Sequence, residues 1–126
     1  MALQILNGPT IRAGESLSEA VDASGGVIIR ITCPSPDDYP GEVNWTPAVL
    51  TFQISSDNVY YNDVYNFTGE LVSVNVVPGA AIMVPEVFGR AAEFIKFRSG
   101  MPKTPIPQEK DRLFAMTIDT YGAAAP

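Results

Sequence analysis

The stretch Trp45–Tyr65, WTPAVLTFQISSDNVYYNDVY, carries the clearest structural signal in the chain. Every second residue of its first half is apolar: Leu50, Phe52 and Ile54. This period of two places three apolar side chains on one face, as in a half-buried strand. Ser56-Asp57-Asn58 then provides residues that favour a turn. We therefore predict a hairpin whose second strand covers Val59–Tyr65, with the core of a β-sandwich built around it.

Similar alternation recurs on both sides of this stretch. It predicts strands at Ser16–Ser18, Gly26–Thr32, Leu71–Val76, Ala80–Val84, Phe94–Arg98 and Arg112–Asp119. In Gly26–Thr32 the alternation places Val27, Ile29 and Ile31 on one face and Ile28 and Arg30 on the other. In the later strands, the residues expected to face the core are Val72, Val74, Val76, Ile95, Phe97, Phe114, Met116 and Ile118. Pro85 suits the first turn of a helix, and Gly89 weakens that helix. The pattern predicts an all-β, antiparallel β-sandwich of the jelly-roll type, with about eight short strands and at most one short helix near residues 85–92.

The length of 126 residues fits a single domain over residues 1–126. Asn7-Gly8-Pro9 interrupts the apolar opening, so residues 1–8 are a candidate N-terminal arm, with an ordinary first strand as the alternative. Residues 121–126 are expected to form a flexible tail. The lone Cys33 cannot form an internal disulfide and is interpreted as a small buried or edge residue.

Charge and hydropathy disfavour two classes of partner, nucleic acids and membranes. The net charge is −6, and residues 1–70 contain nine acidic side chains against Arg12 and Arg30. Nucleic-acid binding is not expected, because neutralising phosphates requires a cationic face. No apolar run reaches the length of a membrane helix, and residues 1–8 show no secretory signal. We expect no membrane association and synthesis in a cytoplasm.

The residue types offer little for catalysis. The chain has no His, which removes the common Ser-His-Asp, Cys-His and His-metal sites, so we expect no enzyme activity and no cofactor. Oxygen ligands cluster at Asp57, Asn58, Asn62 and Asp63, but turns use the same residues for backbone reasons. We interpret the cluster as turn chemistry and expect no metal.

Aromatic side chains gather in and after the hairpin: Trp45, Tyr60, Tyr61, Tyr65 and Phe67. Such rings stack on sugars in recognition sites. A sandwich of this size also needs aromatic residues inside, so the core or a subunit interface is the favoured interpretation.

Two proline-rich loops, Cys33–Trp45 and Gly100–Asp111, are predicted to be extended and exposed. Proline restricts them before binding, which lowers the ordering cost of a contact. With the apolar N-terminal segment, they supply the candidate partner-contact residues: Leu3, Ile5, Pro34, Pro36, Tyr39, Pro102, Pro105 and Pro107.

The hairpin resembles the strand, Ser-Asp turn and aromatic strand of galactose-binding-like jelly rolls. Its combination with EFIKFRSGMPKTPIPQEKDRLFAMTID, residues 93–119, and GESLSEAVDASGGVIIRITCP, residues 14–34, is similar to small structural proteins of tailed bacteriophages and prophages. In those proteins, a strand ending in Arg-Ser-Gly, here Ile95–Gly100, precedes a loop containing Pro and Gln, here Pro102–Gln108, and a final strand, here Arg112–Ile118.

The resemblance implies a virion protein that is made in a bacterial host cytoplasm. Its expected function is capsid decoration (cement), in which a homo-oligomer, most simply a homotrimer, binds the major capsid protein and stabilises the head on the capsid surface. A head-fibre or tail adaptor subunit is the alternative within the virion. A carbohydrate-binding module is the alternative from another class.

Overall fold

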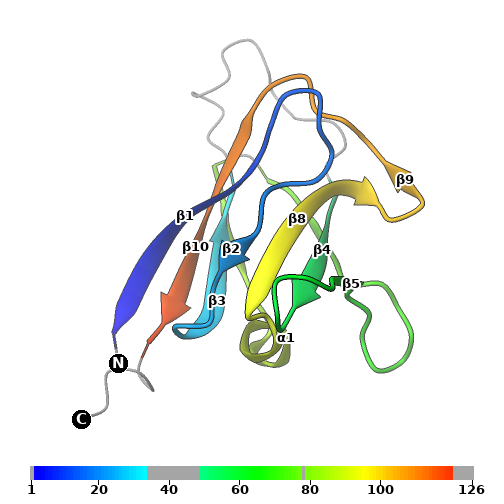
Figure 1. Ribbon diagram of the computed structural model, residues 1–126. Helices are drawn as coiled ribbons and strands as arrows, with labels where there is room; N and C mark the ends of the chain where they lie inside the picture. Colours follow the sequence, from blue (N-terminus) through cyan, green and yellow to red (C-terminus); the bar gives the residue numbers. More distant parts are fainter. Residues whose placement is uncertain (1, 34–48, 78, 121–126) are drawn as a thin grey trace.

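A computed structural model describes residues 2–33, 49–77 and 79–120 of the chain (Figure 1). The elements are β1 (Leu3–Ile11), β2 (Val21–Asp22), β3 (Val27–Thr32), β4 (Val49–Ser55), β5 (Asn62–Asp63), β6 (Ser73–Asn75), β7 (Ala81–Met83), α1 (Glu86–Ala91), β8 (Phe94–Met101), β9 (Thr104–Pro105) and β10 (Arg112–Asp119). The one helix among the described residues lies where the sequence predicted it. No helix in the described part of the chain is long and apolar enough to cross a membrane.

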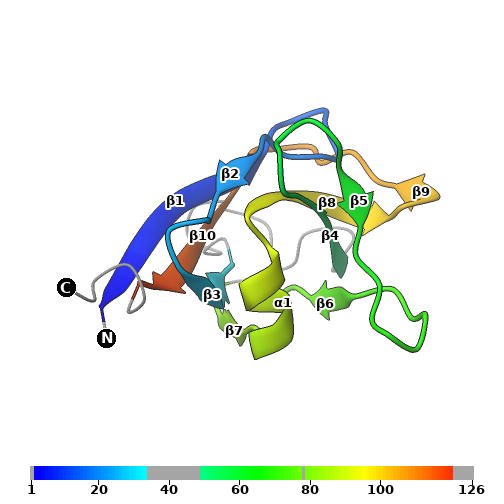
Figure 2. The same ribbon diagram turned by 60° about the horizontal axis from the view of Figure 1, so that its bottom comes forward.

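The strands form two antiparallel sheets. One has the order β1-β10-β3-β7; the other has the order β2-β8-β4-β5, with β6 also paired to β4 and β9 to β8. The pairing is nested, because β1 pairs with β10, β2 with β8, β3 with β7 and β4 with β5. This nested order over two sheets is that of a jelly roll, so the predicted fold class is confirmed. Figures 1 and 2 show the two sheets facing each other, with α1 at the lower end between them.

The predicted hairpin is only partly formed. The first strand, β4, is present, and its main partner is β8, from Leu50 opposite Ser99 to Ser55 opposite Phe94. The returning strand shrinks to β5, two residues long. The prediction of a strand over Val59–Tyr65 is therefore wrong in extent.

The core joins both sheets and the helix through four phenylalanine rings. Phe97 of β8 contacts Phe52 of β4 and Phe114 of β10, with centroid distances of 5.3 and 5.2 Å. Phe88 of α1 lies 5.0 Å from Phe52. The predicted core positions of β4, β6, β8 and β10 are buried or packed against the core: Leu50, Phe52, Ile54, Val72, Val74, Val76, Ile95, Phe97, Phe114, Met116 and Ile118.

The alternation predicted for β3, with Val27, Ile29 and Ile31 on one face and Ile28 on the other, does not hold. Ile28 and Ile31 are both fully buried, whereas Val27 and Ile29 are half-buried. The register between β3 and β10 shifts between Thr117 and Ile118, and this shift adds one residue to β3. A bulge of this kind reverses the alternation on one side of the insertion, which strict period-two counting cannot anticipate.

The N-terminal residues belong to the sandwich rather than to a detached arm. Leu3–Asn7 pairs with β10 of the same chain, and the register then shifts between Asn7 and Thr10. The predicted tail, residues 121–126, lies outside the described residues. Cys33 is buried, as predicted, and burial raises the pKa of its thiol.

Candidate binding surface

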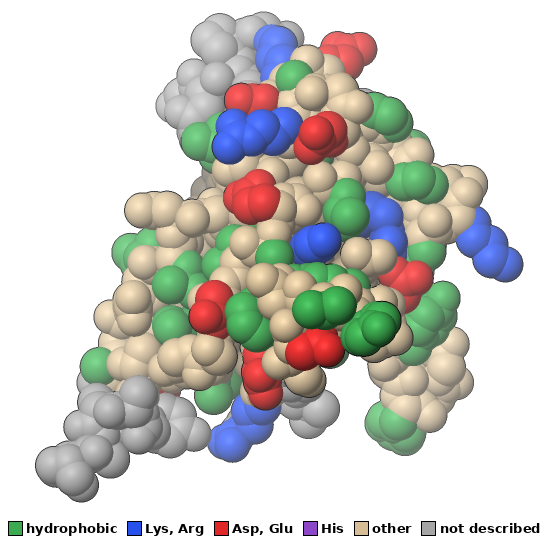
Figure 3. Space-filling model, viewed as in Figure 1, with side chains coloured by type: hydrophobic (Ala, Val, Ile, Leu, Met, Phe, Trp, Pro, Cys, Tyr) green, Lys and Arg blue, Asp and Glu red, His purple; other side chains and the backbone are tan. Residues whose placement is uncertain are grey.

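Four large apolar side chains are exposed on the two loops that flank β5. Val59 and Tyr60 lie between β4 and β5, and Tyr65 and Phe67 lie between β5 and β6. Phe67 is fully exposed. In Figure 3, hydrophobic side chains appear over these loops in the lower right part of the molecule. We call these four residues the loop surface. Val59 and Tyr60 form one exposed apolar group, and Tyr65 and Phe67 form a second on the other side of β5. Exposed apolar groups of this kind mark interaction sites more often than scattered single residues do.

The loop between β4 and β5 is held by a network around Asp57. Its Oδ1 accepts hydrogen bonds from the backbone N–H groups of Val59 and Tyr60, at 2.9 and 3.0 Å, and from the Ser55 hydroxyl at 2.9 Å. These hydrogen bonds lower the pKa of the exposed Asp57 carboxyl. They also draw Val59 and Tyr60 out of the sheet, which explains why β5 begins only at Asn62.

Side chains complete this turn on its other side. The Tyr61 hydroxyl donates to Asn58 Oδ1, and the Lys96 ammonium lies 4.3 Å from the centre of the Tyr61 ring. Asn58 itself has a φ of 60°, in the left-handed region that asparagine tolerates. Asp57 and Asn58 therefore serve the turn, as interpreted from the sequence, whereas Asp63 pairs with Arg98. No group of three or more His, Cys, Asp or Glu side chains that could hold a metal ion occurs among residues 2–33, 49–77 and 79–120.

The loop between β5 and β6 is equally ordered. Asn66 Oδ1 accepts hydrogen bonds from the backbone N–H groups of Thr68 and Glu70, at 3.0 and 2.9 Å, and from the Thr68 hydroxyl at 2.7 Å. The Asn66 N–H donates to the Glu70 carbonyl at 2.8 Å. This closed turn presents Phe67 at its tip. Binding through it costs little ordering entropy, because the backbone is already fixed.

An ion pair between the buried Arg98 and the half-buried Asp63 anchors β5 to the sheet behind the loop surface. Arg98 is 6% exposed, and its Nη2 lies 2.7 Å from Asp63 Oδ1. Arg98 Nε donates to the Thr51 hydroxyl at 3.1 Å, and that hydroxyl donates to the Gly100 carbonyl at 2.6 Å. The network joins β4, β5 and β8, so it fixes the strand from which both loops project.

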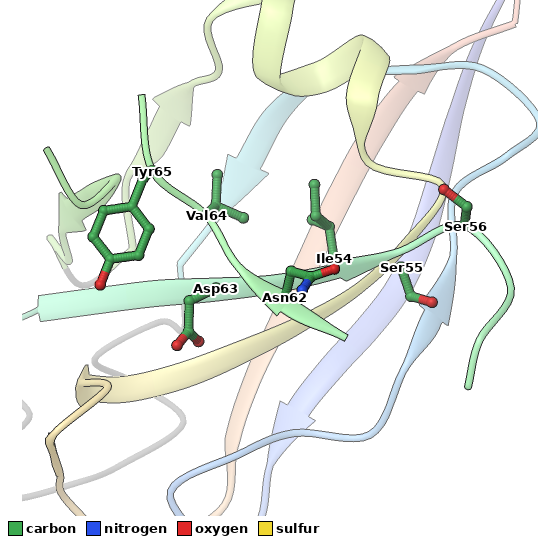
Figure 4. A pocket seen from close by; sticks show the side chains of 7 residues that line it. All are labelled: Ile54, Ser55, Ser56, Asn62, Asp63, Val64 and Tyr65. Carbon is green, nitrogen blue, oxygen red and sulfur yellow. The ribbon is translucent and has the colours of Figure 1, made fainter. Parts of the chain in front are cut away.

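A shallow pocket of about 240 Å³ opens beside β5. Its lining residues are Ile54, Ser55, Ser56, Asn62, Asp63, Val64 and Tyr65. In Figure 4, Ile54 and Val64 point toward α1, while Asp63 points to the opposite side of β5. Polar side chains beside one aromatic ring suit a small polar ligand. Asp63 is already bound by Arg98 and Asp57 by turn amides, so both carboxylates serve structural hydrogen bonds.

The structure separates the contact residues predicted from sequence. Leu3 and Ile5 are exposed on β1. On the connection from β8 to β10, Pro105 and Pro107 are exposed and Pro102 is half-buried. Figures 1 and 2 place the N-terminal end of β1 and the β9 hairpin at opposite ends of the molecule, so these two groups do not form one site. Pro34, Pro36 and Tyr39 lie outside the described residues.

Sequence reasoning interpreted Tyr60, Tyr65 and Phe67 as core or interface residues, and the structure excludes the core for all three. The sequence contains a signal that could have predicted this exposure. Each of the two loops begins with a residue whose side-chain oxygen caps several backbone amides, Asp57 and Asn66, and such capped turns project outward.

Comparisons with protein families, with curated proteins and with solved structures found no match to this chain. The class that the structure defines is a jelly-roll sandwich with exposed apolar loops, and no family can be assigned to it.

The Arg98 ion pair gives a first prediction. Replacing Arg98 with Met leaves Asp63 and the Thr51 hydroxyl without their buried partner, and we expect unfolding free energy to fall by about 2–4 kcal/mol. Arg30→Met is the matched control, since Arg30 is only half-buried and binds the Thr117 hydroxyl at 3.0 Å. We expect the control to lose about 1 kcal/mol or less in urea unfolding. Equal losses would contradict the structural role of the pair.

Proposed function

We propose that this chain is a non-enzymatic structural subunit that binds a partner protein through the loop surface, and that the partner is the major capsid protein of a tailed-phage shell. The chain would then act as a capsid decoration protein on the outside of the virion. The observation that carries the proposal is the exposure of Val59, Tyr60, Tyr65 and Phe67 on two fixed turns. The phage shell as the partner rests on the sequence resemblance alone.

The physical features of the loop surface suit a protein contact. Tyrosine and other aromatic side chains dominate the energetics of protein interfaces. Here they project from turns fixed by Asp57 and Asn66, so little entropy is lost when a partner covers them. A head-fibre or tail adaptor subunit would use the same surface, with a different virion protein as the partner.

Co-sedimentation with capsid shells tests this proposal. The proposal expects a major capsid protein to be encoded beside this chain's gene, and the shells for the test would be assembled from that protein. We expect the native chain to sediment with them and Tyr60→Ser/Phe67→Ser to bind at least about 30-fold more weakly, as loss of two interface aromatics predicts. Leu113→Ser, which alters an exposed leucine of β10, is the matched control and should bind normally.

Three results would count against the proposal. Absence of a capsid gene near this chain's gene would overturn the phage partner. Failure of the native chain to sediment would overturn binding to shells. Equal binding by native chain and double variant would remove the loop surface from the contact.

The pocket beside β5 favours a second candidate, a carbohydrate-binding module. Tyr65 lines it together with Asn62 and Ser55, which offer a stacking ring, an amide and a hydroxyl. A glycan array, followed by sugar titration of native chain and Tyr65→Ala, tests this candidate. Binding that Tyr65→Ala abolishes would support it, and no response from the native chain across the array would exclude it.

A further inference from the structure

The first half of β1 is an open sheet edge. β1 ends the order β1-β10-β3-β7, so Leu3–Asn7 has β10 on one side and no described strand on the other. In both Figure 1 and Figure 2, β1 lies at the outer margin of the described part of the chain. Such an edge presents a row of backbone donors and acceptors to any strand that can approach it.

The hydrogen-bond pattern identifies the residues that face outward. The Thr120 N–H donates to the Ala2 carbonyl at 2.8 Å, which makes Ala2 and Thr120 a hydrogen-bonded pair. In an antiparallel ladder such pairs alternate, so Gln4 and Leu6 also direct their backbone groups toward β10. The N–H and C=O groups of Leu3, Ile5 and Asn7 therefore point to the open edge.

The side chains of this edge are also free to meet a partner. Leu3 is 58% exposed and Ile5 65%. Ile5 lies opposite Thr117 of β10 on the outer face of the sheet. Natural edge strands are commonly protected by lysine, by proline or by short length. Leu3–Asn7 contains neither residue.

Electrostatics permits a second copy of the chain to approach at this edge more readily than elsewhere on the surface. Each copy carries a net charge of −6, so two copies repel across most of their surfaces. Residues 2–11 contain no charged side chain, and this edge is therefore a place where like charges do not oppose approach.

We propose that two copies pair antiparallel through their β1 edges, about a two-fold axis at Ile5. This axis sets Ile5 against Ile5 of the second copy and Leu3 against Asn7. All three outward-facing residues then occupy hydrogen-bonded positions, and the two four-stranded sheets become one continuous sheet. The contact is self-complementary, as a two-fold interface requires. It uses a different surface from the loop surface, so it stands independently of the proposed function.

Mass measurement tests the pairing. An edge of this length buries a small area, so we expect a concentration-dependent dimer whose mass rises from 13.5 kDa toward twice that value. Ile5→Lys places a charge at the axis and should give a monomer at every concentration. Met83→Lys is the matched control, since Met83 is 72% exposed on the same face but on β7, at the opposite edge of the sheet. The control should dimerise normally, and circular dichroism should show both variants folded.

Cysteine cross-linking tests the register. In Ile5→Cys the two new thiols face each other with Cα atoms about 5.5 Å apart, within the range that a disulfide spans. In Leu3→Cys the equivalent atoms are about 14 Å apart, because four register positions separate them. We expect a covalent dimer under oxidation from Ile5→Cys and none from Leu3→Cys. The native Cys33 is buried and common to both variants.

Several outcomes would overturn the inference. A native chain that stays monomeric up to millimolar concentration would do so, as would a mass three times that of one copy, which fits the trimer expected from the resemblance. Loss of the dimer in Met83→Lys as well would indicate packing through the sheet face instead of the edge. Equal cross-linking of Ile5→Cys and Leu3→Cys would exclude the two-fold register.

Discussion

Phe97→Ala is expected to lower the free energy of unfolding by about 3–5 kcal/mol, a large share of the stability of a domain of this size. Phe97 has no solvent exposure. Its ring makes edge contacts with Phe52 of the same sheet and with Phe114 of the opposite sheet. Truncation therefore opens a cavity at the point where the two sheets meet, and neither neighbour can close it without leaving its own sheet.

Two further variants separate this cavity effect from a general effect of losing an aromatic residue. Phe97→Leu keeps most of the volume, and we expect it to cost about 1–2 kcal/mol. Phe67→Ala removes a fully exposed ring, and we expect a change within about 0.5 kcal/mol. Urea unfolding followed by circular dichroism measures all three. A loss below about 1 kcal/mol for Phe97→Ala would show that this ring does not join the two sheets.

The sequence predicted best where one face of a strand packs on the core without interruption. In β4, β8 and β10, period-two alternation places Phe52, Phe97 and Phe114 inward, and all three are buried. Alternation describes only local geometry. It does not show that β4 pairs with β8, because that pairing depends on contacts between residues far apart in the chain.

The errors have a common physical origin in interactions that override local pattern. In β3, a bulge interrupts the alternation, so that Ile28 and Ile31 are both buried. After β4, the Asp57 carboxylate takes the backbone donors of Val59 and Tyr60 that a strand would have used. This competition exposes Tyr60, and a similar set of hydrogen bonds to Asn66 holds the loop that carries Tyr65 and Phe67. The exposure of these three rings was not predicted, because aromatic residues after a strand were expected to continue the sheet or enter the core.

Gly89 shows how a correct prediction can rest on an incomplete reason. From sequence, this glycine only weakens the short helix. In the structure, a Cβ at Gly89 would lie 2.0 Å from the Ile28 carbonyl oxygen. Glycine is therefore required here for close approach, because α1 packs directly on the backbone of β3.

Gly89→Ala is accordingly expected to destabilise the protein by about 3 kcal/mol, although the same change stabilises an isolated helix by about 1 kcal/mol. The Ile28 carbonyl has little room to move, because Ile28 pairs with Ile118 of β10 and its side chain is fully buried. The helix must shift instead, which draws Phe88 from its contact with Phe52. The clash outweighs the helix propensity, and the sign of the effect reverses.

Gly14→Ala provides the control for backbone strain without a clash. Gly14 has a φ of +83°, but a Cβ there would meet no atom within 4 Å, so we expect a loss of about 1 kcal/mol. Urea unfolding should rank Gly89→Ala well below Gly14→Ala in stability, even though Gly89 has ordinary helical geometry. If Gly89→Ala is neutral or stabilising, α1 does not pack against β3 as closely as described, and the helix is then a peripheral turn rather than the element that closes the lower end of the sandwich.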